Sequence, residues 1–251
     1  RRLSVTEEGQ AYLRRVAPVL EELDAAAEAA KGARSLPTGL LRITASIAFS
    51  DKVLVPLLPV FQAQYPNITV DLHCSDTNLD LIEDGIDLAI RLAPAPQGDL
   101  VSSLLMPTHY KVVASPSFLD RSPPCSAPID LTHLNCLRYA LPGLRDTWLF
   151  SQAERDAFGV AVTGSPLIAN AIALRSAALS GIGVALLADW LIDHDLAAGR
   201  LVEIFPEYQS TLSEFETAAW LLYPNRAYLP RKVRVMIDFL KSHLGQATQA
   251  T

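Results

Sequence analysis

Four polar residues, Ser46, Ser50, Ser75 and Arg91, stand where short apolar runs end, and their side chains suit the binding of an anion. Ser46 and Ser50 belong to a segment whose hydroxyls and backbone N–H groups lead into a helix, and a helix N-terminus attracts a carboxylate. Arg91 closes a later apolar run, where its guanidinium can pair with an acid through two parallel hydrogen bonds. These residue types predict a site for a small acidic molecule.

Two of these polar residues also have a simpler role open to them. Ser46 can be a helix cap with no ligand role, which is the commoner use of a serine at the start of a helix. Arg91 can pair with a neighbouring carboxylate such as Asp87 or Asp99. The sequence leaves both alternatives open.

Further side chains complete the predicted site. Ile47 and Phe49 lie between the two serines of the first segment, and Tyr223, at the end of a late strand, is expected to close the cavity. Asn170 and Ala171 begin a helix in the second half of the chain, where the amide of Asn170 can donate to a ligand. Asn170 is equally suited to a helix cap.

The chain carries no arrangement of residues that indicates catalysis. No P-loop, G-x-S-x-G or H-E-x-x-H motif occurs, and Gly181-x-Gly183 lacks the third glycine of a dinucleotide-binding fingerprint. The cysteines, Cys74, Cys125 and Cys136, stand at unrelated spacings, and the five histidines are scattered, which excludes a zinc pattern. We therefore predict no catalytic residue, no metal and no cofactor.

The elements that position these residues alternate as they do in α/β proteins. Apolar or alternating runs predict strands, and apolar residues three and four apart predict helices. We expect strands over 40–45, 67–73, 86–91, 110–115, 183–187, 201–205 and 217–223, a turn over 46–51, and helices over 52–65, 76–84, 147–157, 170–179, 191–198 and 230–244. The β-α-β-α-β order favours parallel sheets in two lobes, with the ligand between them near the carboxyl ends of the strands.

Residues 6–34 predict one long helix with a narrow apolar seam. Thr6 suits the N-cap position. The seam, with residues three and four apart, is formed by Leu13, Val16, Leu20, Leu23 and Ala27. Such a seam indicates dimerisation against one partner helix. The alternative is an amphipathic helix that packs on its own domain.

Charge alone argues against contact with DNA. The 251 residues include 21 Lys and Arg and 27 Asp and Glu, a net charge of −6, whereas a DNA-contacting face should be basic. Residues 1–36 carry equal numbers of acidic and basic groups, so the deficit lies in the rest of the chain. The longest apolar stretch, 182–188, is shorter than the roughly 20 residues that span a bilayer, so no membrane partner is expected.

Several short motifs are individually weak but specific in their order and spacing. They are RRLSVTEEG at 1–9, GLLRI at 39–43, GIDLAIR at 85–91, ALSGIGVA at 178–185, LAAGRLV at 196–202, YP at 223–224 and LPRKVR at 229–234. Through these motifs the chain resembles the LysR-type transcriptional regulators over nearly its full length. Residues 1–9 are similar to the wing end of their winged helix-turn-helix, most of which would precede Arg1.

The resemblance implies an α/β fold with two Rossmann-like lobes of the periplasmic-binding-protein type (type 2), preceded by a long N-terminal linker helix. The wing remnant and the linker and dimerisation helix would occupy residues 1–36, and an effector-binding domain residues 37–247. Lobe I would comprise about 37–109 plus 217–247, and lobe II about 110–216.

The function that the resemblance implies is that of a cytoplasmic, DNA-binding transcriptional regulator and not of an enzyme. A small-molecule effector, anionic or aromatic, would bind between the lobes, where Asn170 occupies a pocket-lining position of the family, and would control transcription allosterically. Homodimers or homotetramers would form through the linker helices. The alternative is a solute-binding protein of a transport system with the same two-lobed fold, against which the apolar seam and the lack of a secretion signal both argue.

Overall fold

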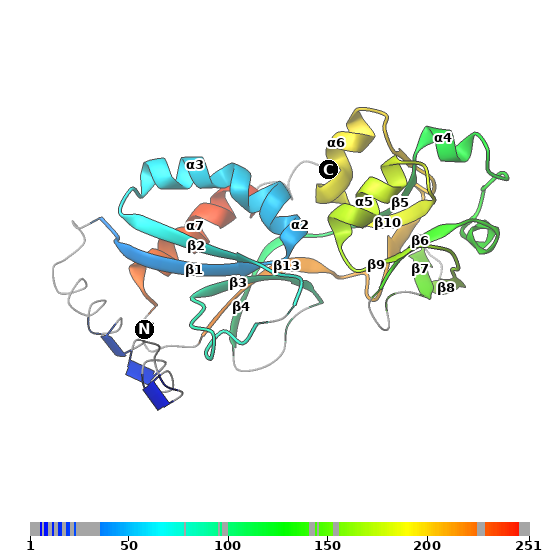
Figure 1. Cartoon of the computed structure of the whole chain (residues 1–251). Coiled ribbons are helices and arrows are strands. Elements are labelled where there is room, and N and C mark those ends of the chain that lie inside the picture. Colours follow the sequence, from blue (N-terminus) through cyan, green and yellow to red (C-terminus); the bar gives the residue numbers. More distant parts are fainter. Residues whose placement is uncertain are drawn as a thin grey trace, which may run out of the picture.

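The structure is a computed structural model. It describes residues 36–77, 79–94, 96, 100–140, 144, 146–152, 156–224 and 229–245, together with residues 6, 8, 9, 12, 15, 16, 19, 20 and 23. Over the described residues, two α/β lobes lie end to end, and each is built on a sheet of its own (Figure 1).

The first lobe is built on a five-stranded sheet in the order β2-β1-β3-β13-β4. β1 (Gly39–Ala45) pairs in parallel with β2 (Ile68–Cys74) on one side and with β3 (Leu88–Ala93) on the other. β13 (Ala218–Pro224) comes from the end of the chain and pairs antiparallel with β3 and with β4 (Leu100–Pro107). Three parallel strands therefore end at the same edge of this sheet.

A continuous helical stretch follows β1. It consists of α2 (Ile47–Phe49), a π-helical segment η1 (Ser50–Leu54) and α3 (Val55–Gln64). The C-terminal helix α7 (Arg231–Leu244) packs beside it, because Phe61 of α3 meets Phe239 edge to face with ring centroids 5.2 Å apart. These helices bury the core of the first lobe against one face of the sheet.

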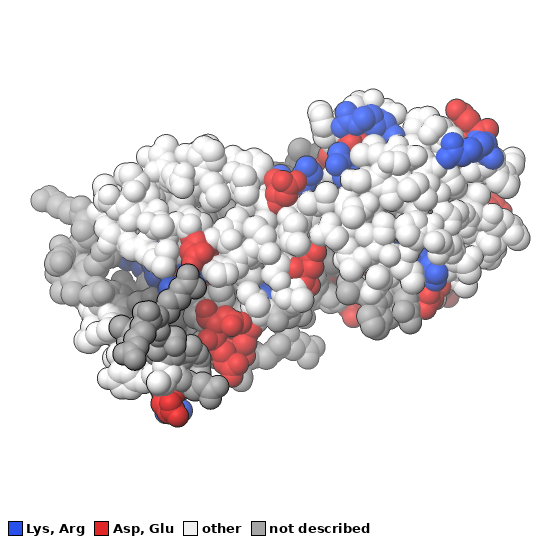
Figure 2. Space-filling view, in the orientation of Figure 1, with Lys and Arg blue, Asp and Glu red and all other residues white. Residues whose placement is uncertain are grey.

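The outer surface of α3 is apolar. Val55 and Val60 are about half exposed, and the helix contains no Lys, Arg, Asp or Glu. Figure 2 shows this uncharged surface over the first lobe. Contiguous apolar patches on a surface mark places where a protein contacts another surface or a ligand.

The second lobe is built on an eight-stranded sheet in the order β8-β7-β12-β5-β10-β6-β9, with β11 also paired to β5. Its strands are β5 (Tyr110–Ala114), β6 (Cys136–Tyr139), β7 (Thr147–Ser151), β8 (Phe158–Ala161), β9 (Leu167–Ile168), β10 (Val184–Ala188), β11 (Val202–Glu203) and β12 (Gln209–Thr211). Its helices are α4 (Pro116–Leu119), the 3-10 helix η2 (Pro128–His133), α5 (Ala171–Leu179) and α6 (Asp189–Ala197). β6 and β10 are parallel neighbours, so their carboxyl ends also share one edge.

The chain crosses between the lobes in two places, from β4 to β5 and from β12 to β13. The backbone N–H of Thr108 in the first crossing donates to the carbonyl of Thr217 in the second over 3.0 Å. The two crossings therefore run side by side and form the hinge of the molecule.

A buried ion pair joins three elements of the first lobe at the start of β3. Asp87 lies just before β3, and its carboxylate accepts a hydrogen bond from the backbone N–H of Arg42 on β1 over 3.0 Å. The Lys232 ammonium of α7 lies 3.0 Å from the same carboxylate oxygen, and both side chains are at most one-tenth exposed. Asp87 therefore connects β1, β3 and α7.

Most predicted elements are confirmed, but three are wrong. The expected turn over 46–51 is helical from Ile47, because Ser46 caps the helix and Ala48 and Phe49 are buried. The expected helix over 147–157 begins as strand β7, whose buried residues Trp148 and Phe150 alternate with less buried ones. The described part of 76–84 holds turns instead of a helix. The strands β4, β6, β8, β9 and β12 were not predicted.

The N-terminal segment is described only at nine positions. Thr6 Oγ1 accepts a hydrogen bond from the N–H of Gly9 over 3.2 Å, which confirms the predicted helix cap, and the eight other described residues are helical. Leu20 and Leu23 are more than half exposed, and Val16 is half-buried. Leu13 and Ala27 of the predicted seam lie outside the described residues.

Replacement of Asp87 by alanine is expected to lower the free energy of unfolding by about 3 kcal/mol. The variant removes the buried carboxylate that faces the Lys232 ammonium and the acceptor of the Arg42 N–H. Urea unfolding measures this loss. The exposed Asp84, changed in the same way, is the control and should alter stability by less than about 0.5 kcal/mol. Equal losses in the two variants would contradict this account.

Candidate functional site

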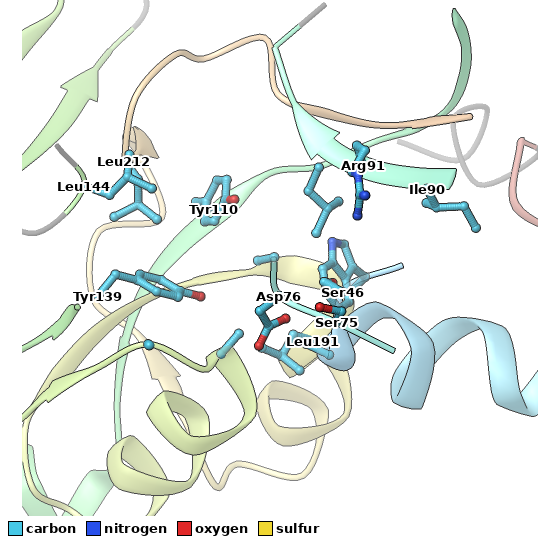
Figure 3. Close-up of a pocket in the computed structure, with 16 residues that line it drawn as sticks. Ser46, Ser75, Asp76, Ile90, Arg91, Tyr110, Tyr139, Leu144, Leu191 and Leu212 are labelled. Carbon is cyan, nitrogen blue, oxygen red and sulfur yellow. The ribbon is translucent and has the colours of Figure 1, made fainter. Parts of the chain in front are cut away.

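A cavity of about 220 Å³ lies between the lobes and takes its walls from both. The first lobe contributes the polar residues Ser46, Ser75, Asp76 and Arg91, and the second contributes Tyr110, Tyr139 and Trp190. Figure 3 shows the labelled side chains of both lobes converging on one space. Apolar residues of the two lobes, Leu92, Leu191 and Leu212 among them, fill the rest of the wall.

Parallel strand pairing explains why residues far apart in the sequence meet here. Ser46 follows β1, Ser75 and Asp76 follow β2, and Arg91 lies near the end of β3. Since these three strands are parallel neighbours, their carboxyl ends open on the same edge of the sheet. On the other side of the cavity, Tyr139 ends β6, and Trp190 comes two residues after the end of β10.

Two hydrogen-bond donors at the cavity are buried without a partner. Nη2 of Arg91 and Nε1 of Trp190 are both inaccessible to solvent, and neither has a hydrogen-bond acceptor among the described residues. Burial also lowers the pKa of the Arg91 guanidinium. Figure 3 shows the Arg91 side chain pointing into the cavity. Because guanidinium and indole N–H groups only donate, a partner for them must be an acceptor.

Two neutral phenols face the same space. Burial, with a smaller effect from Asp189, raises the pKa of Tyr110 to about 12. Burial raises the pKa of Tyr139 still further, with added effects from Tyr110 and Asp76. Both hydroxyl groups therefore stay protonated at neutral pH and are able to donate or accept hydrogen bonds. In Figure 3 the hydroxyl of Tyr139 points toward Asp76.

Asp76 connects the two lobes across the opening of the cavity. Its Oδ1 accepts a hydrogen bond from the backbone N–H of Ile47 over 3.0 Å, at the start of the helical stretch in the first lobe. Its Oδ2 accepts one from Nδ2 of Asn170 over 2.8 Å, in the second lobe. Oδ1 of Asn170 in turn caps α5 by accepting from the N–H of Ala173 over 3.1 Å.

Apolar contacts reinforce this bridge. The rings of Phe49 and Trp190 meet edge to face with centroids 5.3 Å apart, and Ala48 packs into the core of the second lobe. The structure therefore presents the lobes in contact beside the cavity.

Four of the predicted binding residues line the cavity, namely Ser46, Ser75, Arg91 and Ala171. Ser46 is also the N-cap, since its hydroxyl accepts from the N–H of Phe49 over 3.3 Å. Of the carboxylates considered for Arg91, Asp87 contacts Lys232. Asp99 lies outside the described residues.

The other five predicted residues are not among those that line the cavity. The side chain of Ile47 is 39% exposed, whereas Phe49 is buried against Trp190. Ser50 is buried, and its hydroxyl has no partner among the described residues. Asn170 contacts Asp76, and Tyr223 packs against the core of the first lobe. Their contact with an effector stays a prediction.

Sequence reasoning missed Asp76, Tyr110, Tyr139 and Trp190, all of which line the cavity. The rule that sites lie after the carboxyl ends of strands would have found Asp76 and Trp190, since each closely follows a predicted strand. Tyr139 lies in a four-residue strand that the pattern did not reveal.

The described residues show neither a metal site nor a membrane span. No group of three or more His, Cys, Asp or Glu side chains in the described part of the chain is placed to hold a metal ion. No helix among those residues is both long and apolar enough to cross a membrane.

Comparison with protein families matches residues 34–245 to the LysR substrate binding domain. The HTH-type transcriptional regulator CrgA of Neisseria meningitidis serogroup C (strain 8013) is 32% identical over 247 residues, which cover 98% of this chain and 80% of that protein. The HTH-type transcriptional regulator PtxR of Pseudomonas aeruginosa is 30% identical over 246 residues, covering 98% and 77%.

Solved structures agree with these sequence matches. The structure of CrgA superposes with a TM-score of 0.74 at 29% identity, over 98% of this chain and 82% of that one. The full-length structure of the Vibrio cholerae virulence activator AphB gives 0.73 at 25% identity, over 96% and 81%. The predicted fold class, two lobes of the periplasmic-binding-protein type, is confirmed, and the relatives are transcriptional regulators and not enzymes.

Replacement of Arg91 by methionine is expected to raise the free energy of unfolding of the ligand-free protein by about 1 kcal/mol, because it removes a buried donor that lacks a partner. Thermal or urea unfolding measures the change. Arg138 is the matched control, since its guanidinium donates to the carbonyl of Gly164 and to Asp146. Arg138→Met should therefore destabilise the protein. Destabilisation of similar size in both variants would contradict the assignment of Arg91 as a donor held free for a ligand.

Proposed function

The chain belongs to the LysR family of transcriptional regulators, and we propose that its effector is a small organic acid that Arg91 holds in the cavity between the lobes. As a member of that family the protein is a DNA-binding regulator with an effector-binding domain, and not an enzyme or the binding protein of a transporter. The acidic character of the effector is the new element here.

The observation that carries this proposal is the pair of buried donors, Arg91 Nη2 and Trp190 Nε1. A buried donor without an acceptor costs about 1 to 3 kcal/mol. A carboxylate removes this cost, because its oxygens only accept and because it matches the guanidinium in charge. An uncharged effector would satisfy the hydrogen bonds but would leave the half-buried guanidinium charge without a counterion.

The size of the cavity limits the rest of the effector. An apolar cavity of about 150 Å³ in another protein admits a benzene ring. The 220 Å³ here therefore suit one ring, or an aliphatic chain of similar bulk, together with a carboxylate. The apolar walls formed by Leu92, Leu191 and Leu212 favour an aromatic or aliphatic body.

The placement of the donors on both lobes supports allosteric control. Arg91 belongs to the first lobe, and Tyr110, Tyr139 and Trp190 belong to the second. An acid that contacts both sides binds only when the lobes are close together, so it shifts the population toward that arrangement. The crossings at Thr108 and Thr217 connect the lobes. A change in the arrangement of the lobes would therefore be transmitted to any domain that is attached to either lobe.

We extend the proposal to the domain organisation and assembly of the protein. The linker and dimerisation helix would lie within residues 1–36 and the effector-binding domain over 37–247, divided into lobe I (about 37–109 plus 217–247) and lobe II (about 110–216). DNA would be contacted by a winged helix-turn-helix, in the cytoplasm. The exposed Leu20 and Leu23 and the uncharged surface of α3 support assembly into a homodimer or homotetramer.

The test of this function uses the full-length protein and its promoter DNA. We expect at least one small aromatic or aliphatic acid to change the affinity or the footprint, and Arg91→Met to abolish that change while leaving the affinity for DNA without effector intact. Quantitative footprinting measures both. An unaltered response in the Arg91 variant, or a response only to uncharged compounds, would contradict the proposal.

Assembly through the helical seam gives a separate prediction. Lysine at both Leu20 and Leu23 should weaken self-association by more than about tenfold, since two charges would enter an apolar interface. Sedimentation equilibrium measures the dissociation constant. Val19 is also more than half exposed but lies off the seam, so Val19→Lys should have the smaller effect. Unchanged assembly of the double variant would show that the seam is not the interface.

A further inference from the structure

We infer that Asp76 determines the specificity of the cavity, by selecting effectors with one acidic end and rejecting those with two. The inference rests on the proposed function, because it takes the acid site at Arg91 and Trp190 as given. It concerns a residue that was not among those predicted from the sequence to bind the effector.

Asp76 places its own carboxylate between the N-termini of two helices that belong to different lobes. Oδ1 accepts from the N–H of Ile47, which starts the continuous helical stretch through Gln64, over 3.0 Å. Oδ2 accepts from Asn170, the cap of the nine-residue helix α5, over 2.8 Å. A helix N-terminus is where an incoming anion would otherwise find backbone donors. The protein therefore occupies this anion position with a side chain of its own.

Because Asp76 occupies the donors at the two helix N-termini, the acidic group of the effector is left with the donors of Arg91 and Trp190. The backbone N–H of Ile47 and the amide of Asn170 are engaged with Asp76, whereas Arg91 Nη2 and Trp190 Nε1 have no acceptor among the described residues. Asp76 and Arg91 stand apart in the close-up, and no ion pair joins these two described residues (Figure 3). The cavity thus has a basic end and an acidic end.

The carboxylate of Asp76 at the acidic end determines which group the effector can carry at its second end. Asp76 lines the cavity and is itself exposed, so it stands at the opening, with the hydroxyl of Tyr139 pointing toward it. A hydroxyl or amine of the effector would find acceptors there, since each carboxylate oxygen accepts more than one hydrogen bond. A second carboxylate would instead meet a like charge. Solvent at the opening screens this repulsion but does not remove it.

The experiment measures binding of three ring acids and two chain acids to the 251-residue chain by calorimetry. The probes are benzoate, 4-hydroxybenzoate, terephthalate, hexanoate and adipate. We expect each dicarboxylate to bind at least about fivefold more weakly than its monocarboxylate partner, the factor that corresponds to water-screened repulsion at about 4 Å. We expect 4-hydroxybenzoate to bind at least as tightly as benzoate.

Asp76→Asn keeps the size of the side chain and removes its charge. It should therefore raise the affinity for each dicarboxylate, relative to the affinity for its monocarboxylate partner, by about fivefold. Asp71→Asn is the matched control. Asp71 lies five residues earlier, on β2, and pairs with Arg42 and His73 away from the cavity. The control should leave the ratio unchanged. Thermal unfolding of both variants confirms that they fold.

Three results would overturn the inference: a ratio that Asp76→Asn does not move, dicarboxylates that bind the unaltered chain as tightly as monocarboxylates, or no binding of any probe to the unaltered chain. The two proposals fail separately. Selective binding without any effect on promoter DNA would contradict the proposed function alone. A DNA response to an acid, with a ratio that Asp76→Asn leaves unmoved, would contradict this inference alone.

Discussion

The whole cleft depends on the parallel pairing of β1 with β2 and β3. Parallel neighbours end at one edge, and this brings Ser46, Asp76 and Arg91 together although the sequence separates them widely. The Asp87 carboxylate stabilises this arrangement, because it joins β1 and α7 beside the start of β3. The second lobe supplies its part of the wall by the same rule, through β6 and β10. Binding chemistry here is thus a consequence of strand direction.

The site also illustrates how function opposes stability. A core that served folding alone would leave neither Arg91 Nη2 nor Trp190 Nε1 buried without an acceptor. The surrounding packing, including the contact between Phe49 and Trp190, offsets the loss of folding stability that these two unpaired donors cause. Groups held ready in this way lose less freedom when a ligand arrives, which favours affinity.

The sequence predicts the fold better than it predicts the site, and the reason is physical. The run 230–244 is amphipathic with a clear helical period, and 52–65 is long and uniformly apolar, so both could be read as helices. By contrast, β6 has four residues and β9 has two. The prediction of a helix over 147–157 is wrong because burial of Trp148 and Phe150 in the second lobe favours a strand there. Ser46 and Arg91 stand at strand ends and were found locally. The role of Asp76 depends on Asn170, 94 positions later, and no local pattern contains that contact.

The paired crossings at Thr108 and Thr217 have a mechanical consequence. The two segments are joined to each other by a backbone hydrogen bond and are the covalent connections between the lobes, so they act as one narrow joint about which the lobes can turn. The molecule is elongated on either side of this joint (Figure 1). Each lobe is therefore a lever arm: for any rotation about this joint, atoms at the outer ends of the lobes move farther than atoms at the cavity.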